Sequence, residues 1–361
     1  MDYSPVTILK TVILVCLGIA LSLLVFAPIL EITDPNGYKI MSVDPVSGLP
    51  LYIPNSSVTL LTGCFENSAV INNIGFHGPP VAAEKGKDVF RIVVLGSSFI
   101  EARQVQVASM FSTLLEQKLN DNLQKAHTYE VIPLGFNGNG TFQNTLYYKY
   151  YGSPLKPDLV IVIETGFELY RHLDNPPLDQ QGKVILEAPK THDSAAMASL
   201  KALLRNSKLL VNLYSRSLML KDASLAFLNH PLFFMPTPAP AAGPDKAQAE
   251  QARWDIKEKI IDALLEQTKA DRAQFLYAAF AGREEPASTI EEISRHMEDM
   301  ALQKGFEYDN LVPFVFAAEE ATGKPAALLP CDGHWSNDGH QFVANALFDY
   351  LSHHPALLGR P

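Results

Sequence analysis

The sequence predicts an α/β fold with a central parallel sheet, preceded by one N-terminal transmembrane helix. Three observations lead to this prediction: an uncharged run at 11–30, short apolar runs that alternate with helix-like segments from 89 onward, and a length of 361 residues with 47% hydrophobic content. A chain of this size can bury one large core beside an anchor.

The uncharged run at 11–30 predicts a membrane anchor within residues 1–32. Twenty helical residues at about 1.5 Å each span a bilayer core, and signal peptides have shorter apolar cores and a small-residue cleavage site. We therefore expect an uncleaved signal anchor. Lys10 precedes the run and Glu31 and Asp34 follow it, which places the N-terminus inside. In a bacterium the C-terminal domain would then lie in the periplasm, attached to the inner membrane by a single pass.

The charge of the chain argues against nucleic acid as a partner. Its formal net charge is −10 and no basic stripe runs along it. The ten histidines lack the spacing of a metal motif, and no paired Cys-x-x-Cys is present. We expect neither a metal nor a cofactor.

Residues 33–87 predict an irregular lead-in with a few short strands, because they are rich in Asn, Pro, Gly and Ser. The main domain follows at 88–354. Buried strands are expected at 89–95, 129–134, 159–164 and 275–280, and helices at about 106–120 and 141–151. Strands that alternate with helices predict a parallel sheet.

The region from about 173 to 250 predicts an insertion into this domain. It contains an amphipathic helical pattern near 197–220 and an Ala/Pro-rich loop at 236–244. Apolar residues at helical spacing then predict a helix around 254–265 and a closing helix around 342–351.

Ser98 is a candidate nucleophile. It follows the strand predicted at 89–95 across a tight turn of Gly96 and Ser97. A serine hydroxyl needs a sharp turn to expose it and a neighbouring base to remove its proton. The turn at the carboxyl end of a parallel strand lies at the edge where such sheets bind ligands. A serine that caps the following helix would explain this segment equally well.

Asp332 and His334 are the candidate acid and base. Because they are two residues apart, an extended loop places both side chains on the same side. The imidazole could then accept the serine proton while the carboxylate fixes its tautomer. A polar loop in which Asn337 or Asp338 caps the closing helix is the alternative, but it does not explain the Asp-Gly-His-Trp run at 332–335.

From about 44 to 351 the sequence resembles the SGNH (GDSL-like) hydrolases. The family's first block, a strand followed by Gly-Asp-Ser, is similar to residues 95–98, and its second block is similar to 134–141. Its last block is similar to 332–335, in the form seen in membrane-anchored proteins that resemble polysaccharide O-acetyltransferases and esterases.

The resemblance implies a flavodoxin-like three-layer sandwich around the parallel sheet. It makes Ser98 the nucleophile, His334 the base and Asp332 the residue that orients the base. The backbone N–H groups of Ser98 and Gly138 would form the oxyanion hole.

The sequence departs from the family at two positions. Ser97 stands where Asp is usual, and Phe167 stands where the third block supplies an Asn to the oxyanion hole. Loss of one such donor typically costs about 10²- to 10³-fold in rate. Asn137 and Asn139 are the candidates to replace it.

Cys64 and Cys331 are the only cysteines beyond the predicted anchor. An oxidising compartment would permit a disulfide between them, and two free buried thiols are the alternative.

Two functions from different classes follow from these features. The first is an anchored serine esterase or O-acyltransferase that acts on acyl esters, above all acetyl esters, of a cell-envelope glycan. The second is a catalytically degenerate domain that binds glycan or serves as a structural subunit with other membrane proteins of an envelope complex. An α/β-hydrolase is disfavoured because Ile100 occupies the place of the glycine that follows its nucleophile.

Overall fold

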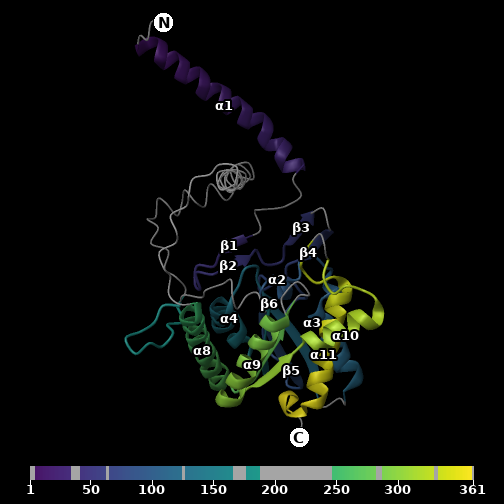
Figure 1. Ribbon diagram of the computed structural model, residues 1–361. Helices are drawn as coiled ribbons and strands as arrows, with labels where there is room; N and C mark the ends of the chain where they lie inside the picture. Colours follow the sequence, from purple (N-terminus) through teal and green to yellow (C-terminus); the bar gives the residue numbers. More distant parts are fainter. Residues whose placement is uncertain are drawn as a thin grey trace. The chain divides into compact units, whose positions relative to one another are not determined.

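The structure, a computed structural model, describes residues 5–33, 41–61, 65–123, 127–165, 176–187, 246–281, 287–328 and 332–359 (Figure 1). These residues belong to two units. One contains helix α1 (Pro5–Thr33), and the other, Ser42–Lys190 with Pro244–Pro361, contains the main sheet.

The prediction of a helix over 11–30 is confirmed, because α1 includes this run. The prediction that this helix crosses the membrane is not supported. A search of the described part of the chain finds no helix with the length and apolar character of a membrane span.

The second unit is built on a five-stranded parallel sheet with the order β6-β5-β7-β8-β9. Its strands are β5 (Val89–Gly96), β6 (Thr128–Gly135), β7 (Leu159–Thr165), β8 (Gln274–Phe280) and β9 (Glu307–Asn310). In chain order this is the 2-1-3-4-5 arrangement of flavodoxin-like folds. The parallel sheet and its first four strands are therefore predicted correctly. Strand β9 was not expected, because its four residues include no apolar run and lie at the sheet edge.

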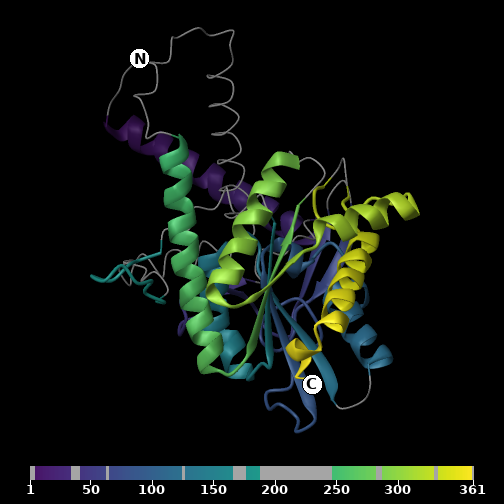
Figure 2. The same ribbon diagram turned by 60° about the horizontal axis from the view of Figure 1, so that its bottom comes forward.

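Helices cover both faces of this sheet (Figure 2). On one face, α3 (Phe111–Asn122) contacts α11 (Asn337–His353) and β6. Phe111, Leu115 and Phe342 of these helices belong to one core cluster with apolar residues of β5 and β7. On the opposite face lie α4 (Thr141–Tyr147) and α8 (Lys246–Ala270), which contact each other. Two layers of helix around one sheet confirm the predicted α/β architecture.

The remaining helices complete the second unit. They are α2 (Ser98–Glu101), α9 (Ala287–Lys304) and α10 (Val312–Thr322), with 3₁₀ turns at Val107–Ser109, Ser153–Leu155 and Pro355–Leu358 and a π-helical turn at Tyr148–Gly152. The helix expected from 106 begins only at Phe111, because Met110 is extended and packs with Ala102 and Val105. The helix expected over 141–151 changes from α to π at Tyr148.

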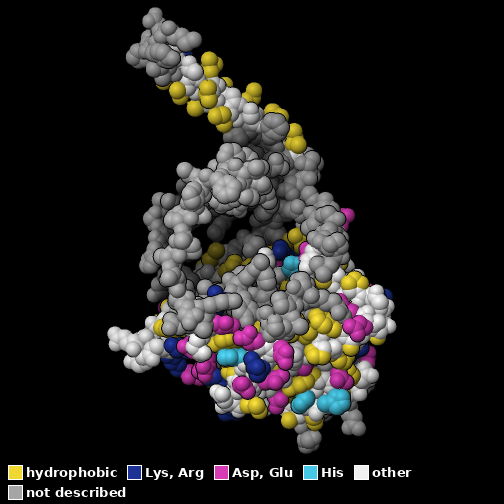
Figure 3. All heavy atoms as spheres, viewed as in Figure 1, with side chains coloured by type: hydrophobic (Ala, Val, Ile, Leu, Met, Phe, Trp, Pro, Cys, Tyr) yellow, Lys and Arg dark blue, Asp and Glu magenta, His cyan; other side chains and the backbone are white. Residues whose placement is uncertain are grey.

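Four short strands precede the main sheet as two pairs. β1 (Met41–Val43) pairs with β2 (Pro50–Tyr52), and β3 (Ser57–Leu61) pairs antiparallel with β4 (Glu66–Val70). Short strands were expected in this stretch, whereas its role as an irregular lead-in stays a prediction. Acidic and basic side chains are interspersed over the described surface of the second unit that Figure 3 shows.

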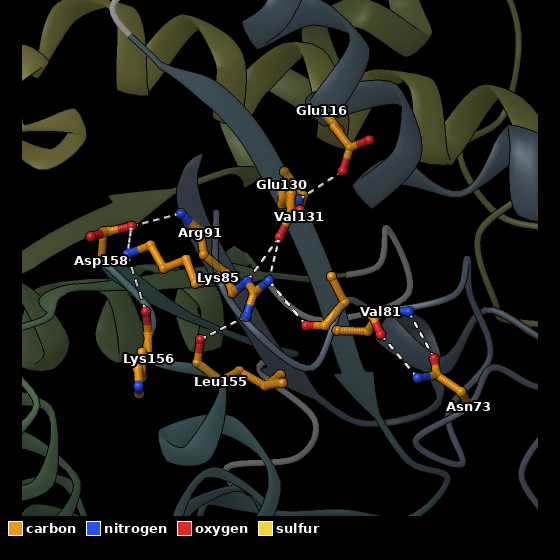
Figure 4. A network of polar contacts seen from close by, with 11 residues as sticks. Asn73, Val81, Lys85, Arg91, Glu116, Glu130, Val131, Leu155, Lys156 and Asp158 are labelled. Carbon is orange, nitrogen blue, oxygen red and sulfur yellow. Dashed lines mark hydrogen bonds and ion pairs between the residues drawn. The ribbon is translucent and has the colours of Figure 1, made fainter. Parts of the chain in front are cut away.

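A buried arginine fixes the amino end of β5 (Figure 4). Arg91 is fully buried, pairs with Glu130 at 2.8 Å and donates to the carbonyls of Leu155 and Ala82. A buried guanidinium is tolerated only when its donors are paired. The contact with Ala82 joins the lead-in to the sheet, at the end of β5 opposite Ser98.

Several predictions concern residues outside the described ranges. These are the Cys64–Cys331 bridge, the position of Phe167, the helix near 197–220 and the loop at 236–244.

Candidate active site

Ser98 lies at the carboxyl end of β5, as the first residue of α2. Two glycines allow this short helix to cross the strand ends. A Cβ atom on Gly96 would lie 2.2 Å from Cγ1 of Ile100, and one on Gly135 would lie 2.2 Å from the backbone nitrogen of Glu101. Larger residues at either position would displace α2.

The alternative role of Ser98 as a helix cap is wrong. The cap position of α2 is Ser97, whose side chain makes no capping bond. The Ser98 side chain instead contacts His334.

The loop before α11 is folded back on itself. Ala327 pairs with Trp335 in an antiparallel bridge, and the backbone N–H of Leu328 donates to the carbonyl of His334 at 2.9 Å. Gly339 permits this fold, because a Cβ atom there would lie 2.0 Å from the carbonyl oxygen of Ala326.

Trp335 orients the preceding histidine. Its fully buried ring packs against Phe99, Phe111 and Phe280, with ring centroids 5.1 to 6.0 Å apart. Neighbouring residues of an extended segment point to opposite sides. Trp335 therefore enters the core while His334 faces Ser98.

The three residues predicted from the sequence meet in a continuous hydrogen-bonded chain. Nε2 of His334 lies 2.7 Å from Oγ of Ser98, and Nδ1 lies 2.5 Å from Oδ1 of Asp332. The same carboxylate oxygen accepts the backbone N–H of His334 at 2.8 Å. A base must lie about 2.6–3.2 Å from the proton that it removes, and His334 satisfies this condition.

The alternative prediction for this segment, a polar loop in which Asn337 or Asp338 caps the closing helix, is wrong as well. Ser336 caps α11 by accepting the backbone N–H of Gly339 at 3.1 Å, so neither Asn337 nor Asp338 is the cap. A cap at Ser336 leaves Asp332 and His334 free for the contacts with Ser98.

Gly138 lies at the same edge of the sheet as Ser98. The strand register pairs Gly96 with Gly135, and the N–H of Phe136 donates to the carbonyl of Gly96 at 3.2 Å. Gly138 follows in a turn, with φ of +79° and an exposed backbone. Among the described residues, no acceptor is assigned to the N–H of Ser98 or of Gly138. Both groups fit the predicted role of oxyanion donors.

The two asparagines beside Gly138, the candidates to replace the donor that the third block normally supplies, differ in their surroundings. Asn139 is only 4% exposed and its side-chain amide donates to Oδ1 of Asn144 at 3.2 Å. Asn137 is exposed, and its role as a donor stays a prediction. A buried carboxylate, Glu101, follows Ser98 by three positions and accepts the hydroxyl of Tyr52 at 2.6 Å. Sequence reasoning did not identify this carboxylate.

A second buried carboxylate lies at the end of β7. Glu164 forms an ion pair with Lys257 of α8 and accepts the hydroxyls of Tyr277 at 2.6 Å and Thr141 at 3.0 Å. Burial raises the pKa of Glu164, but the charge of Lys257 and the hydrogen bonds outweigh it and the pKa is lowered. One signal was available: Lys257 interrupts an apolar helical pattern, three residues after Trp254.

Within the described ranges, no group of three or more His, Cys, Asp or Glu side chains is placed to hold a metal ion.

Comparison with known proteins gives only structural matches, since no family model and no curated protein matches the sequence. An acetyl xylan esterase has 14% identity and a TM-score of 0.42, over 73% of this chain and 100% of that chain. A catalytic mutant of an acetylxylan esterase from Geobacillus stearothermophilus has 13% and 0.41, over 72% and 93%. A GDSL-like lipase from Parabacteroides merdae has 14% and 0.42, over 74% and 98%.

Each of these three structures shares 14% or less of its sequence with the chain and has a TM-score below 0.5. At these identities the case for its chemistry rests on the chain's own residues, above all Ser98, His334 and Asp332.

Proposed function

We propose that this protein is a serine esterase that cleaves acyl esters through a covalent intermediate on Ser98. The observation that supports this proposal is the hydrogen-bonded chain from Oγ of Ser98 through His334 to Asp332. Ser98 and His334 are both partly exposed, so a substrate can reach them.

The geometry supports a two-step reaction. His334 takes the hydroxyl proton as Oγ of Ser98 bonds to the ester carbon, and the N–H groups of Ser98 and Gly138 stabilise the oxyanion. The ester C–O bond then breaks, and His334 returns the proton to the leaving alcohol. Water attacks the acyl-enzyme in the second step and releases the acid and the free serine.

The proposed substrate is an acetyl ester on a glycan. The support is the sequence block at 332–335, which is similar to that of O-acetyltransferase- and esterase-like proteins. A glycan hydroxyl that replaced water in the second step would make the same site an O-acyltransferase.

A fluorophosphonate probe tests the nucleophile. We expect wild-type protein to be labelled on Ser98 and Ser98→Ala to remain unlabelled, with kcat for an aryl acetate lowered by about 10⁴-fold or more. The matched control is Ser97→Ala, which removes the neighbouring hydroxyl and leaves the hydrogen-bonded chain intact. Folded wild-type protein that is neither labelled nor active would favour the glycan-binding alternative.

The acceptor is tested with an acetylated glycan. Release of free acetate, unchanged when a deacetylated glycan is added, is expected of an esterase. Transfer of labelled acetyl groups to the added glycan would identify an O-acyltransferase.

We also propose a location for the enzyme. It lies on the periplasmic side of the inner membrane, and α1 attaches it to that membrane. This location is supported by the uncharged run at 11–30 and by the exposed apolar side chains along α1, such as Leu9, Leu14 and Leu21 (Figure 3). Protease digestion of intact and of permeabilised spheroplasts tests it. Digestion only after permeabilisation would contradict the periplasmic location.

A further inference from the structure

The turn that contains Gly138 sets the direction of one proposed oxyanion donor. The backbone N–H of Asn139 donates to the carbonyl of Phe136 at 3.1 Å, which makes 136–139 a β-turn with Gly138 at its third position. The φ of +79° at Gly138 is the value that a type II turn requires there. The N–H of Gly138 belongs to the central peptide of this turn, so its direction depends on how firmly the turn is held.

The last residue of the turn has a buried side chain that is bonded to a helix. Asn139 is only 4% exposed, whereas Asn137 and Gly138 are exposed. The side-chain amide of Asn139 donates to Oδ1 of Asn144 at 3.2 Å. Asn144 lies on α4, is fully buried, and donates its backbone N–H to the carbonyl of Gly140 at 2.9 Å. A side chain therefore attaches the turn to the start of α4.

Glu164 bonds the other end of the Asn144 amide. Nδ2 of Asn144 donates to Oε1 of Glu164, at the end of β7, over 3.4 Å. The second carboxylate oxygen accepts the hydroxyls of Thr141 at 3.0 Å and Tyr277 at 2.6 Å and pairs with Lys257 of α8. Because both oxygens have donors, any rotation of this carboxylate would leave buried polar groups unpaired, which is costly.

The charge of Glu164 gives these contacts one direction. Burial raises its pKa, but Lys257 and the hydrogen bonds lower the pKa below the usual value, so the group is ionised at neutral pH. An ionised carboxylate only accepts hydrogen bonds, so Asn144 must turn its NH₂ group to Glu164 and its carbonyl oxygen to Asn139. That oxygen in turn requires the NH₂ group of Asn139. The carboxylate thus fixes a side chain two contacts away, in the turn.

We propose that Asn139, Asn144 and Glu164 form an amide relay of positioning residues that holds the 136–139 turn so that the N–H of Gly138 faces the oxyanion. The amide relay acts on the reaction through the backbone of Gly138 and not through contact with the ester. This inference rests on the proposed esterase function, because the oxyanion forms only when the nucleophile attacks an ester.

The unusual third block gives the amide relay its importance. Phe167 stands where the family's third block supplies an Asn that donates a side-chain hydrogen bond. The N–H groups of Ser98 and Gly138 are the backbone donors that the resemblance leaves for the oxyanion. Preorganised donors of this kind supply a large part of the stabilisation of the transition state, so a displaced Gly138 should slow the reaction.

The test variant is Asn144→Leu, which has a similar volume but neither accepts from Asn139 nor donates to Glu164. We expect kcat to fall about 10- to 100-fold with KM within about threefold, because stabilisation of the transition state is lost. If this variant does not fold, Asn139→Ala removes only the contact nearest the turn. It should lower kcat at least fivefold with the same pattern in KM.

An inhibitor that forms an oxyanion gives a readout that a general loss of stability does not change. When Oγ of Ser98 bonds to the carbonyl carbon of an aryl trifluoromethyl ketone, the serine proton passes to His334 and the ketone oxygen becomes an oxyanion. The inhibition constant in Asn144→Leu should rise by about the factor by which kcat/KM falls, as expected for an analogue of the transition state.

Asn120→Leu is the matched control. Asn120 of α3 also bonds through both ends of its amide, since Oδ1 accepts the backbone N–H of Tyr129 at 2.9 Å and Nδ2 donates to the carbonyl of the same residue at 2.9 Å. Tyr129 lies at the amino end of β6, away from Gly138. The control should lower the urea midpoint, as Asn144→Leu does, while kcat and the inhibition constant stay within about twofold of the wild type.

Hydrogen exchange separates this inference from the proposed function. In Asn144→Leu the backbone N–H of Asn139, which closes the turn, should exchange at least tenfold faster than in the wild type, and in Asn120→Leu it should not. Equal rates in wild type and Asn144→Leu would overturn the amide relay even if the protein is not an esterase. An active wild type with unchanged kcat and inhibition constant in Asn144→Leu would overturn the inference and leave the esterase function standing.

Discussion

Two histidines six positions apart occupy opposite environments. His334 belongs to the catalytic loop, defined as 332–335, and about a third of its side chain is exposed. His340 lies in the first turns of α11 and is fully buried. One ring contacts a hydroxyl and a carboxylate, whereas the other accepts the backbone N–H of Phe111 at 3.3 Å and lies beside the amide of Gln104.

The two environments give the rings different chemistry. Burial, together with the charges of His77 and His334, lowers the pKa of His340 to about 3, so its ring stays neutral. The same ring stacks on Phe111 and meets the edge of Trp335. His340 thus acts as a packing residue that supports Trp335, and through Trp335 it supports His334. Only His334 of the two has the partners needed to exchange a proton.

The largest contrast between the two histidines should appear with His334→Ala. Removing the base should lower kcat/KM for an aryl acetate by about 10⁴-fold or more, while the free energy of unfolding changes by about 1 kcal/mol or less. Ester hydrolysis and urea denaturation measure the two quantities. Retained activity would show that another group activates Ser98.

Asp332→Asn tests the carboxylate that contacts His334 and leaves the imidazole ring in place. An amide next to Nδ1 can hold the imidazole in the wrong tautomer, so we expect kcat to fall by about 10²- to 10⁴-fold with an unchanged unfolding midpoint. The backbone N–H of His334 can still donate to the amide oxygen, which should preserve the loop. A loss of less than about fivefold would contradict the orienting role of Asp332.

The elements that were predicted correctly are those whose signals are local. Strands β5 to β8 are runs of apolar residues, and Asp332 and His334 share a side because an extended segment repeats every two residues. Strand β9 was missed because its pairing with β8, rather than its own polar residues, makes it a strand.

The residues that were missed depend on contacts between distant segments. Glu101 follows Ser98 by three positions, yet only Tyr52 of β2 and the neighbouring Arg103 make its burial possible. Lys257 is buried because Glu164 lies opposite it in space, 93 positions away in the sequence. A charged residue in a sequence is normally expected at the surface, so neither contact could be inferred without the fold.

His340→Gln should have the reverse effect of His334→Ala. The variant leaves the catalytic loop in place but loses ring stacking, so we expect the free energy of unfolding to fall by about 1–3 kcal/mol and kcat to change far less than in His334→Ala. Denaturation and hydrolysis at pH 7.5 measure both. An enzyme of wild-type stability would contradict the packing role of His340.

The smallest expected difference is in how steeply the free energy of unfolding changes with pH. In the unfolded chain His340 and His77 take up protons near pH 6.5, whereas in the folded protein burial lowers their pKa values to about 3 and about 4. Between these limits the unfolded state binds more protons, so acidification below pH 6.5 lowers the free energy of unfolding. Each histidine contributes up to about 1.4 kcal/mol per pH unit.

The variant His340→Gln isolates the share of one ring. It removes one of the two contributions, while titrating carboxylates are common to both proteins and cancel in the comparison. Urea denaturation between pH 6.5 and 4.5 should therefore give a slope that is smaller by up to about 1.4 kcal/mol per pH unit than in the wild type. Equal slopes would mean that His340 takes up its proton while still folded, and the contrast between the two histidines would then rest on their partners alone.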